Sequence, residues 1–187
     1  MSAAKSCRSM HGGWAGLTWA ALAVGIVALA EPALAAPSSS VVTELLDRAR
    51  IENMLTDYYA NLGPGGRDMG AAYTPDGVLD VNGTVVRGAK AIDGLYKKVA
   101  EAAVLPRGTY NMLITNLKIV VHGDSATSED IWTGVISPTP ESTPRFVEQG
   151  HERDVLVKVH GRWYFKHRVI TSDGGLPKMF EKTYRRR

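Results

Sequence analysis

The order of hydrophobic periodicities along the chain constrains its fold most strongly. In the first half, apolar residues recur at three- and four-residue spacing over 41–62 and 89–103, which predicts two amphipathic helices. The second half changes to long runs rich in β-branched residues, which predict strands at 110–121, 126–136, 146–159 and 162–171. Helices followed by antiparallel strands are typical of an α+β fold with the helices on one face of a sheet.

Turn signals separate these segments. A glycine- and proline-rich run at 63–66 ends the first helix, and residues 68–73 fit a short helical turn. After a turn at 74–77, Asn82-Gly83 predicts a tight hairpin between short strands at 78–81 and 84–86. A strongly twisted sheet of this kind can curl around its helices and leave a closed-ended pocket.

The first 35 residues have the organisation of a secretory signal peptide. Lys5 and Arg8 precede an apolar run at 17–30, and small residues at Ala33 and Ala35 form a cleavage site. The run has 14 residues, short of the ~20 that span a bilayer, so no stable membrane insertion is expected. We therefore predict a signal peptide at 1–35, a linker at 36–40, and a periplasmic or secreted mature protein.

The composition excludes several classes of site. The only cysteine, Cys7, lies in the predicted signal peptide, which excludes disulfides and thiolate chemistry from the mature chain. The whole chain carries a formal charge of only +3, and its one tight basic cluster is at 185–187, which argues against a nucleic-acid partner. The histidines lack the spacing of metal ligands, and no glycine-rich loop follows a strand, so neither a metal nor a cofactor is expected.

Four stretches resemble the SnoaL-like branch of the nuclear transport factor 2-like superfamily: residues 51–59; the turn Tyr73-Thr74-Pro75-Asp76-Gly77; residues 114–119 with 123–126; and residues 150–154 with 161–163 and Arg168. The resemblance covers 41–171 and leaves 172–187 as a basic tail. It implies a cone, in which a curved antiparallel sheet wraps around the N-terminal helices and encloses a pocket. Family members include polyketide cyclases, scytalone dehydratase and steroid isomerases, so the resemblance implies a pocket without fixing a reaction.

Two positions depart from the family pattern. Met112 stands where the family often has histidine, and Asn61-Leu62-Gly63 replaces an acidic residue after the first helix. Both changes remove groups that could move a proton. Tyr58 and Tyr59 remain, either to polarise a ligand carbonyl or to pack as core aromatics. Asn116 lies among apolar neighbours, where a buried amide would bind either a ligand or the backbone.

The most polar predicted strand segment is 150–154. Alternation places Glu152 and Asp154 on one face and His151 on the other. Two acids on one face could raise each other's pKa and provide a general base, or they could form ion pairs with Arg168 or Lys166 on the neighbouring strand. The candidate catalytic residues are Glu152, His151, Tyr58 and Tyr59, and the candidate ligand-binding residues are Asn116, Asn111, Asp154 and Trp132. We also expect His167 to share an apolar face with Trp163 and Phe165.

The sequence is consistent with two functions. One is a cofactor-free lyase or isomerase acting on a small hydrophobic carbonyl compound, and the other is a non-catalytic ligand-binding or dimerisation domain. A homodimer is expected in either case. The run 146–159 has apolar residues at both odd and even positions, so both faces of this strand are apolar. The helices can bury one face of the sheet, and a second subunit would bury the other. Members of the family resembled commonly pair through that outer face.

Overall fold

The computed structural model describes residues 38–62, 68–102 and 108–183. The predicted signal peptide at 1–35 lies outside these ranges, as do residues 36 and 37 of the linker and the basic cluster at 185–187. None of the helices in the described segments has the length and hydropathy that crossing a bilayer requires.

The observed elements follow the predicted order. Helix α1 (Ser39–Ala60) is followed by the 3-10 helix η1 (Met69–Ala72), strands β1 (Tyr73–Val81) and β2 (Thr84–Arg87), and helix α2 (Ala89–Ala102). Four long strands come next: β3 (Thr109–His122), β4 (Ser125–Ser137), β5 (Arg145–Val159) and β6 (Arg162–Gly174). A second 3-10 helix, η2 (Lys178–Thr183), ends the described chain. The α+β prediction is confirmed.

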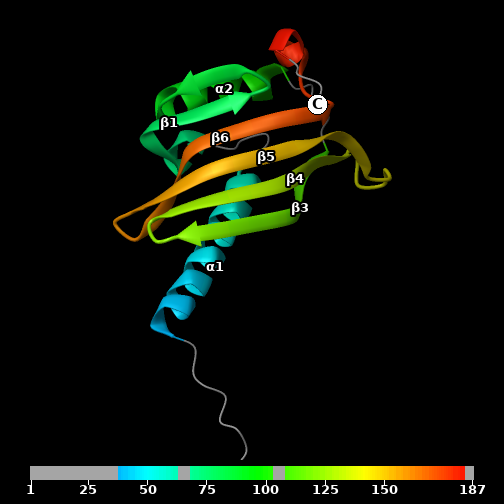
Figure 1. Cartoon of the computed structure of the whole chain (residues 1–187). Coiled ribbons are helices and arrows are strands. Elements are labelled where there is room, and N and C mark those ends of the chain that lie inside the picture. The colour runs from blue at the N-terminus through cyan, green and yellow to red at the C-terminus, as the bar shows by residue number, and fades with distance from the viewer. Residues whose placement is uncertain (1–37, 63–67, 103–107, 184–187) are drawn as a thin grey trace, which may run out of the picture. The chain divides into compact units, whose positions relative to one another are not determined.

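The strands form one six-stranded sheet in the order β2-β1-β6-β5-β4-β3. All neighbouring pairs are antiparallel except β1 and β6, which run parallel, so the sheet is mixed where a wholly antiparallel one was expected. Figure 1 shows α1 crossing one face of this curved sheet, with α2 close to β1. This arrangement is the cone that the resemblance implied.

The core lies between the helices and the inner face of the sheet. Helix α1 buries Ile51, Leu55 and Tyr58, one or two turns apart, as expected for an amphipathic helix. The remaining core residues come mainly from α2 and the sheet, and the most deeply buried of them are Leu79, Ile92, Leu156 and Phe165. The hairpin prediction is also confirmed, because Asn82 and Gly83 both have positive φ (50° and 86°), as a type I′ turn requires.

A β-bulge in β6 changes which side chains face the core. Val155 pairs with His167 and Leu156 pairs with Phe165, so Lys166 is an extra residue without an opposite partner. One extra residue reverses the alternation beyond it. Arg168 therefore lies fully buried, while His167 is exposed. The expectation that His167 shares the face of Trp163 and Phe165 is wrong for this reason.

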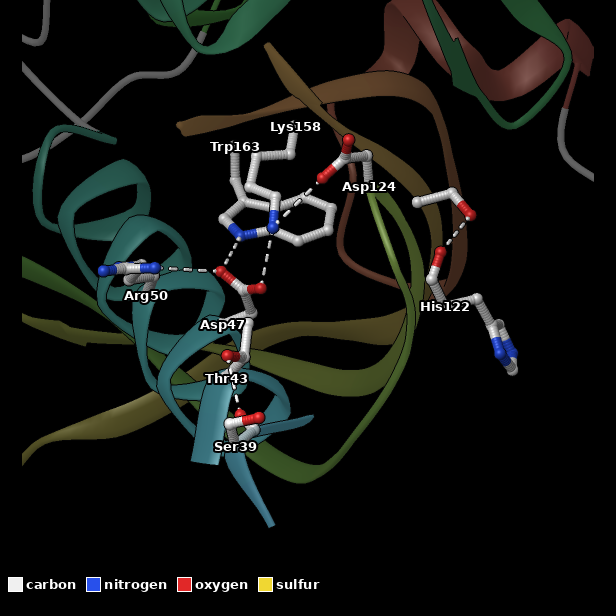
Figure 2. A network of polar contacts seen from close by, with 9 residues as sticks. Ser39, Thr43, Asp47, Arg50, His122, Asp124, Lys158 and Trp163 are labelled. Atoms are coloured by element: carbon white, nitrogen blue, oxygen red, sulfur yellow. Dashed lines mark hydrogen bonds and ion pairs between the residues drawn. The ribbon is translucent and has the colours of Figure 1, made fainter. Parts of the chain in front are cut away.

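A buried carboxylate ties α1 to the β5–β6 hairpin, as Figure 2 shows. Asp47 is 1% exposed and accepts hydrogen bonds from Lys158 Nζ (2.8 Å), Trp163 Nε1 (3.3 Å) and Arg50 Nη1 (3.1 Å). Burial raises the pKa of Asp47, but these donors outweigh it and hold the pKa below its usual value. Lys158 also pairs with Asp124 at 3.1 Å, so the network extends to the β3–β4 turn.

The segment after Thr171 belongs to the folded domain. Strand β6 continues to Gly174, with Ser172 2% exposed and bonded through its backbone N–H to Asn82 Oδ1 (2.9 Å). Phe180 on η2 is 2% exposed and packs in the core. The predicted domain boundary at Ser172 is therefore too early. Phe180 lies nine residues after the end of the last predicted strand, and its packing in the core holds this segment to the domain.

Candidate functional site

The helices and the inner face of the sheet enclose a cavity of about 700 Å³. This volume is in the range of sites that take drug-sized ligands. Its walls are largely apolar, with Leu95, Met112, Trp132, Ile136, Ile170 and Phe180 among them. Its polar lining groups include tyrosines at 58, 59, 96 and 110 and glutamates at 148 and 152. A mostly apolar cavity with a few polar groups is typical of a small-molecule site.

Glu152 lies on this wall at the centre of β5. It is 3% exposed and sits between Asp130 on β4 and Ile170 on β6 in the strand register. Its Oε2 accepts a hydrogen bond from the Tyr59 hydroxyl and contacts Arg168 Nη2. Within the described residues, these hydrogen bonds and the ion pair all fall on Oε2, and none falls on Oε1. One carboxylate oxygen is therefore anchored while the other has no protein partner there.

Arg168 is the positive charge of this cluster. It is fully buried, and besides Glu152 it contacts the Tyr59 hydroxyl and lies 3.4 Å from Asp154 Oδ1 through Nε. Its guanidinium carbon lies 4.4–5.1 Å from the ring centroids of three aromatic residues, Tyr58, Tyr59 and Phe165. Burial lowers the pKa of Arg168 to about 10, which still leaves it charged at neutral pH.

Three buried carboxyl groups cluster here, and two of them, Glu152 and Asp154, contact the Arg168 guanidinium. Asp130, Glu152 and Asp154 each offer an oxygen within 4.8 Å of the other two. Burial raises the pKa of Glu152 and of Asp154, and the charge of a neighbouring carboxylate adds to each rise. One guanidinium cannot balance three carboxylates, so the cluster retains at least one proton near neutral pH. The oxygens are close enough to share a cation, but Arg168 already supplies positive charge there, so the arrangement fits a guanidinium better than a metal ion.

Asp130 is the least compensated of the three acids. It is 4% exposed, and neither carboxylate oxygen has a hydrogen-bond partner among the described residues. Burial raises its pKa to about 7. A carboxyl group that titrates near 3.8 when unfolded and near 7 when folded lowers stability as the pH rises between these values, because the unfolded chain ionises first.

We therefore expect Asp130→Asn to flatten the pH dependence of stability. Between pH 4 and pH 8 the stability of the variant relative to the native protein should rise by up to roughly 4 kcal/mol, at about 1.4 kcal/mol per pKa unit. This corresponds to a relative change of about 10 °C in the unfolding midpoint, measured by calorimetry at both pH values. If the stabilities of the two proteins changed with pH in the same way, Asp130 would be ionised to the same extent in the folded and the unfolded chain.

Three tyrosine hydroxyls form a second polar group at the cavity. The Tyr58 hydroxyl bonds to those of Tyr73 (3.1 Å) and Tyr96. Burial raises the pKa of all three phenols, so they are neutral at physiological pH. Three O–H groups joined by two hydrogen bonds leave one O–H to donate elsewhere. Tyr58 and Tyr96 line the cavity and Tyr73 does not, so this proton can be donated to an oxygen atom of a ligand when Tyr58 or Tyr96 holds it.

The structure brings together four of the predicted site residues. Glu152, Tyr58, Tyr59 and Trp132 all line the cavity. Asp154 is on the same face of β5, 3% exposed, but lies outside the set of lining residues and accepts from Ser128 Oγ at 2.9 Å. The Asp154–Arg168 ion pair is one of the two alternatives that the sequence left open, and it is buried.

Three predicted site residues lie away from the cavity. His151 is on the outer face of β5, where it pairs with Asp173 at 3.2 Å. Asn111 is exposed on β3. Asn116 is also exposed, so the buried amide expected there is wrong. It lies in a β-bulge between Thr115 and Lys118 with φ of 55°, a left-handed conformation that asparagine tolerates better than most residues.

The sequence interpretation missed other residues of the site: Asp130, Tyr96, Tyr110 and Glu148. Alternation along 126–136 places Asp130 on the same face as Trp132, which is a signal that could have identified it. Tyr96 falls in the helix predicted at 89–103, but nothing in the helical pattern shows that its hydroxyl meets that of Tyr58. Tyr110 and Glu148 are 38 residues apart, and their contact depends on the β3–β4–β5 register.

Comparison with known proteins agrees with this fold. A structure of a protein of unknown function from Mycobacterium tuberculosis is 25% identical, with a TM-score of 0.58 over 71% of this chain and 75% of that chain. A candidate scytalone dehydratase from Novosphingobium aromaticivorans is 21% identical (TM-score 0.59; 72% and 89% covered). The β subunit of a candidate aromatic-ring-hydroxylating dioxygenase from the same organism is 14% identical (TM-score 0.57; 71% and 92% covered).

No curated protein sequence matches the chain significantly. A family match nevertheless covers most of the described domain. The SnoaL-like domain matches residues 43–169, which include α1 except its first four residues, the four long strands except the end of β6, and the cavity residues Glu148 and Glu152. The chain therefore belongs to the SnoaL-like domain family and has its nuclear transport factor 2-like fold.

Proposed function

We propose that this protein binds a small hydrophobic carbonyl compound in its cavity and that Glu152 moves a proton on it, as in a cofactor-free lyase or isomerase. The main observation behind this proposal is that the two oxygens of the Glu152 carboxylate differ in their hydrogen-bond partners. Oε2 is anchored by Tyr59 and Arg168, whereas Oε1 has no partner among the described residues and its side chain lies on the cavity wall. A base held in one orientation against an apolar wall is suited to abstracting a proton from carbon.

The proton balance of this chemistry follows from the site. Oε1 takes a proton from the carbon next to the ligand carbonyl, and the electron pair of that C–H bond becomes a C=C bond. Negative charge moves to the carbonyl oxygen, where the Tyr58–Tyr96 hydroxyls donate a hydrogen bond. Glu152 then returns the proton to another carbon in an isomerase, or to a departing hydroxyl group, which leaves as water, in a lyase.

The likeness to a candidate scytalone dehydratase supports a lyase among these choices. A specific observation favours a second function, non-catalytic ligand binding. Glu152 and Arg168 form a fully buried ion pair, and such pairs also occur as purely structural elements. Both functions use the same cavity, and only the first requires proton transfer.

A substitution that narrows the cavity tests whether the ligand binds there. Met112 lines the cavity from β3 and is half-buried, so Met112→Trp should fill part of the space. We expect the affinity for 2-tetralone, a bicyclic ketone, to fall at least about tenfold, measured by isothermal titration calorimetry. The matched control is Met179→Trp, since Met179 is 40% exposed on η2 and is not a lining residue.

Unchanged affinity in Met112→Trp, or equal losses in both tryptophan variants, would place the ketone outside the cavity. An unfolding midpoint within a few degrees of the native value should accompany each measurement, so that loss of binding is not loss of fold.

We further propose that the protein is a homodimer that pairs through the outer face of the sheet. Leu113 on β3 and Val155 on β5 are 45% and 42% exposed, although both are large and apolar. Light scattering at micromolar concentration should give twice the monomer mass, and a Leu113→Glu/Val155→Glu double variant should give the monomer mass. A native protein that scatters as a monomer contradicts the proposal.

Export is proposed on the basis of the N-terminal sequence. Mass spectrometry of the protein from the host's exported fraction should give a chain that begins at Ala36. A mass that includes residues 1–35 would exclude cleavage there.

A further inference from the structure

A second tyrosine–glutamate pair lines the cavity away from Glu152. Tyr110 on β3 donates a hydrogen bond to Glu148 Oε1 on β5, and both residues are half-buried lining residues. Burial raises the pKa of Glu148, while the bond from Tyr110 opposes that rise. Glu148 precedes Glu152 by four residues on the inner face of β5, so their backbone positions lie about 13 Å apart along the strand.

Two glycines make room for the Glu148 side chain. Gly134 is directly opposite Glu148 on β4, and a Cβ there would lie 2.6 Å from Glu148 Cγ and 3.0 Å from the Tyr110 hydroxyl. A Cβ on Gly175 would lie 2.4 Å from Glu148 Cβ, and the φ of 92° at Gly175 also favours glycine. Glu148 is therefore set into the wall between β4 and the segment that follows β6.

We infer that Glu148 binds a hydroxyl group of the ligand, at the opposite end of the cavity from the carbonyl that meets Glu152. The inference rests on the proposed function and narrows its substrate class to hydroxy-substituted hydrophobic carbonyl compounds. A carboxylate only accepts hydrogen bonds, and Tyr110 supplies a donor to one of its two oxygens. A ligand hydroxyl supplies a donor to the other. A cationic donor fits less well, because a charge would be buried against mostly apolar walls.

Two compounds that differ by one hydroxyl group test this site. 6-Hydroxy-2-tetralone and 2-tetralone share a carbonyl and a ring system, and calorimetry gives the ratio of their affinities for each protein. We expect the native protein to bind the hydroxylated compound at least about tenfold more tightly, since a hydrogen bond to a charged group discriminates by this much. Glu148→Gln should bring the ratio close to one and leave the affinity for 2-tetralone within about twofold.

A second variant keeps the carboxylate but displaces it. Gly134→Ala inserts a methyl group against Glu148, so it should lower the same ratio without removing any charge. Glu129→Gln is the matched control, because Glu129 is an exposed carboxylate paired with Arg153 at 3.6 Å, and its affinity ratio should equal the native one.

A result that contradicts only the role of Glu148 can be distinguished from a result that contradicts the proposed function. If both compounds bind with equal affinity to the native protein and to Glu148→Gln, the cavity binds ketones but Glu148 does not select a hydroxyl group, and only this inference is overturned. If neither compound binds, the proposed function fails and the inference fails with it.

Discussion

Arg168→Met should destabilise the fold by about 3–5 kcal/mol at neutral pH. The variant keeps the unbranched stem of the side chain but removes the guanidinium, so Glu152 and Asp154 stay buried without the positive charge that contacts them in the native protein. Removing one partner of a buried ion pair typically costs this much, because the remaining charge is not compensated. The unfolding midpoint should fall by about 10 °C, measured by calorimetry at pH 8.

The pH dependence of the stability loss in Arg168→Met distinguishes the contribution of the Arg168 charge from the contribution of its packing. Without the guanidinium, the folded pKa of each neighbouring carboxyl group rises further above its unfolded value. The penalty is therefore full above the folded pKa and decreases as the pH falls toward the unfolded pKa. The loss relative to the native protein should thus be smaller at pH 5 than at pH 8.

A neutral version of the cluster provides the control. The triple variant Arg168→Met/Glu152→Gln/Asp154→Asn removes the charges together and should recover much of the lost stability, since hydrophobic or neutral replacements of buried ion pairs are often tolerated. Equal losses at both pH values and no recovery in the triple variant would mean that Arg168 stabilises the fold by packing on the aromatic rings around it.

The fold follows closely from the sequence because its signals are local. The spacing of apolar residues over 41–62 and the turn residues Asn82-Gly83 act within a few positions of the chain, and both gave elements that the structure confirms. The parallel pairing of β1 with β6 depends on contacts across about 90 residues, so no local pattern predicted it.

The site was predicted only in part because its side chains depend on bulges and long-range register. Glu152 was predicted on one face with Asp154 by simple alternation, and the structure places both on the inner face. Alternation fails where a residue is inserted. The bulge at Lys166 turns Arg168 inward and His167 outward, and the bulge at Asn116 places that residue on the surface. Neither bulge has a glycine or proline to mark it in the sequence.

Glu152→Gln should have the largest effect on activity. Glutamine has nearly the same shape as glutamate, but its amide cannot take a proton from carbon at neutral pH. Loss of a general base typically lowers a rate by 10²–10⁴-fold. Tyr59 and Arg168 can still contact the side-chain oxygen of the glutamine, and 2-tetralone should bind the variant with an affinity close to that of the native protein.

The measurement is hydrogen–deuterium exchange next to the carbonyl of 2-tetralone in D₂O, followed by proton NMR. We expect the native protein to accelerate the exchange above the buffer rate. Glu152→Gln should lower this acceleration at least about 100-fold, and Glu129→Gln, on the outer face, should leave it unchanged. Two results would contradict proton transfer by Glu152: exchange with Glu152→Gln at the rate of the native protein, or exchange at the buffer rate with native protein that binds the ketone. Either result would leave ligand binding as the function of the cavity.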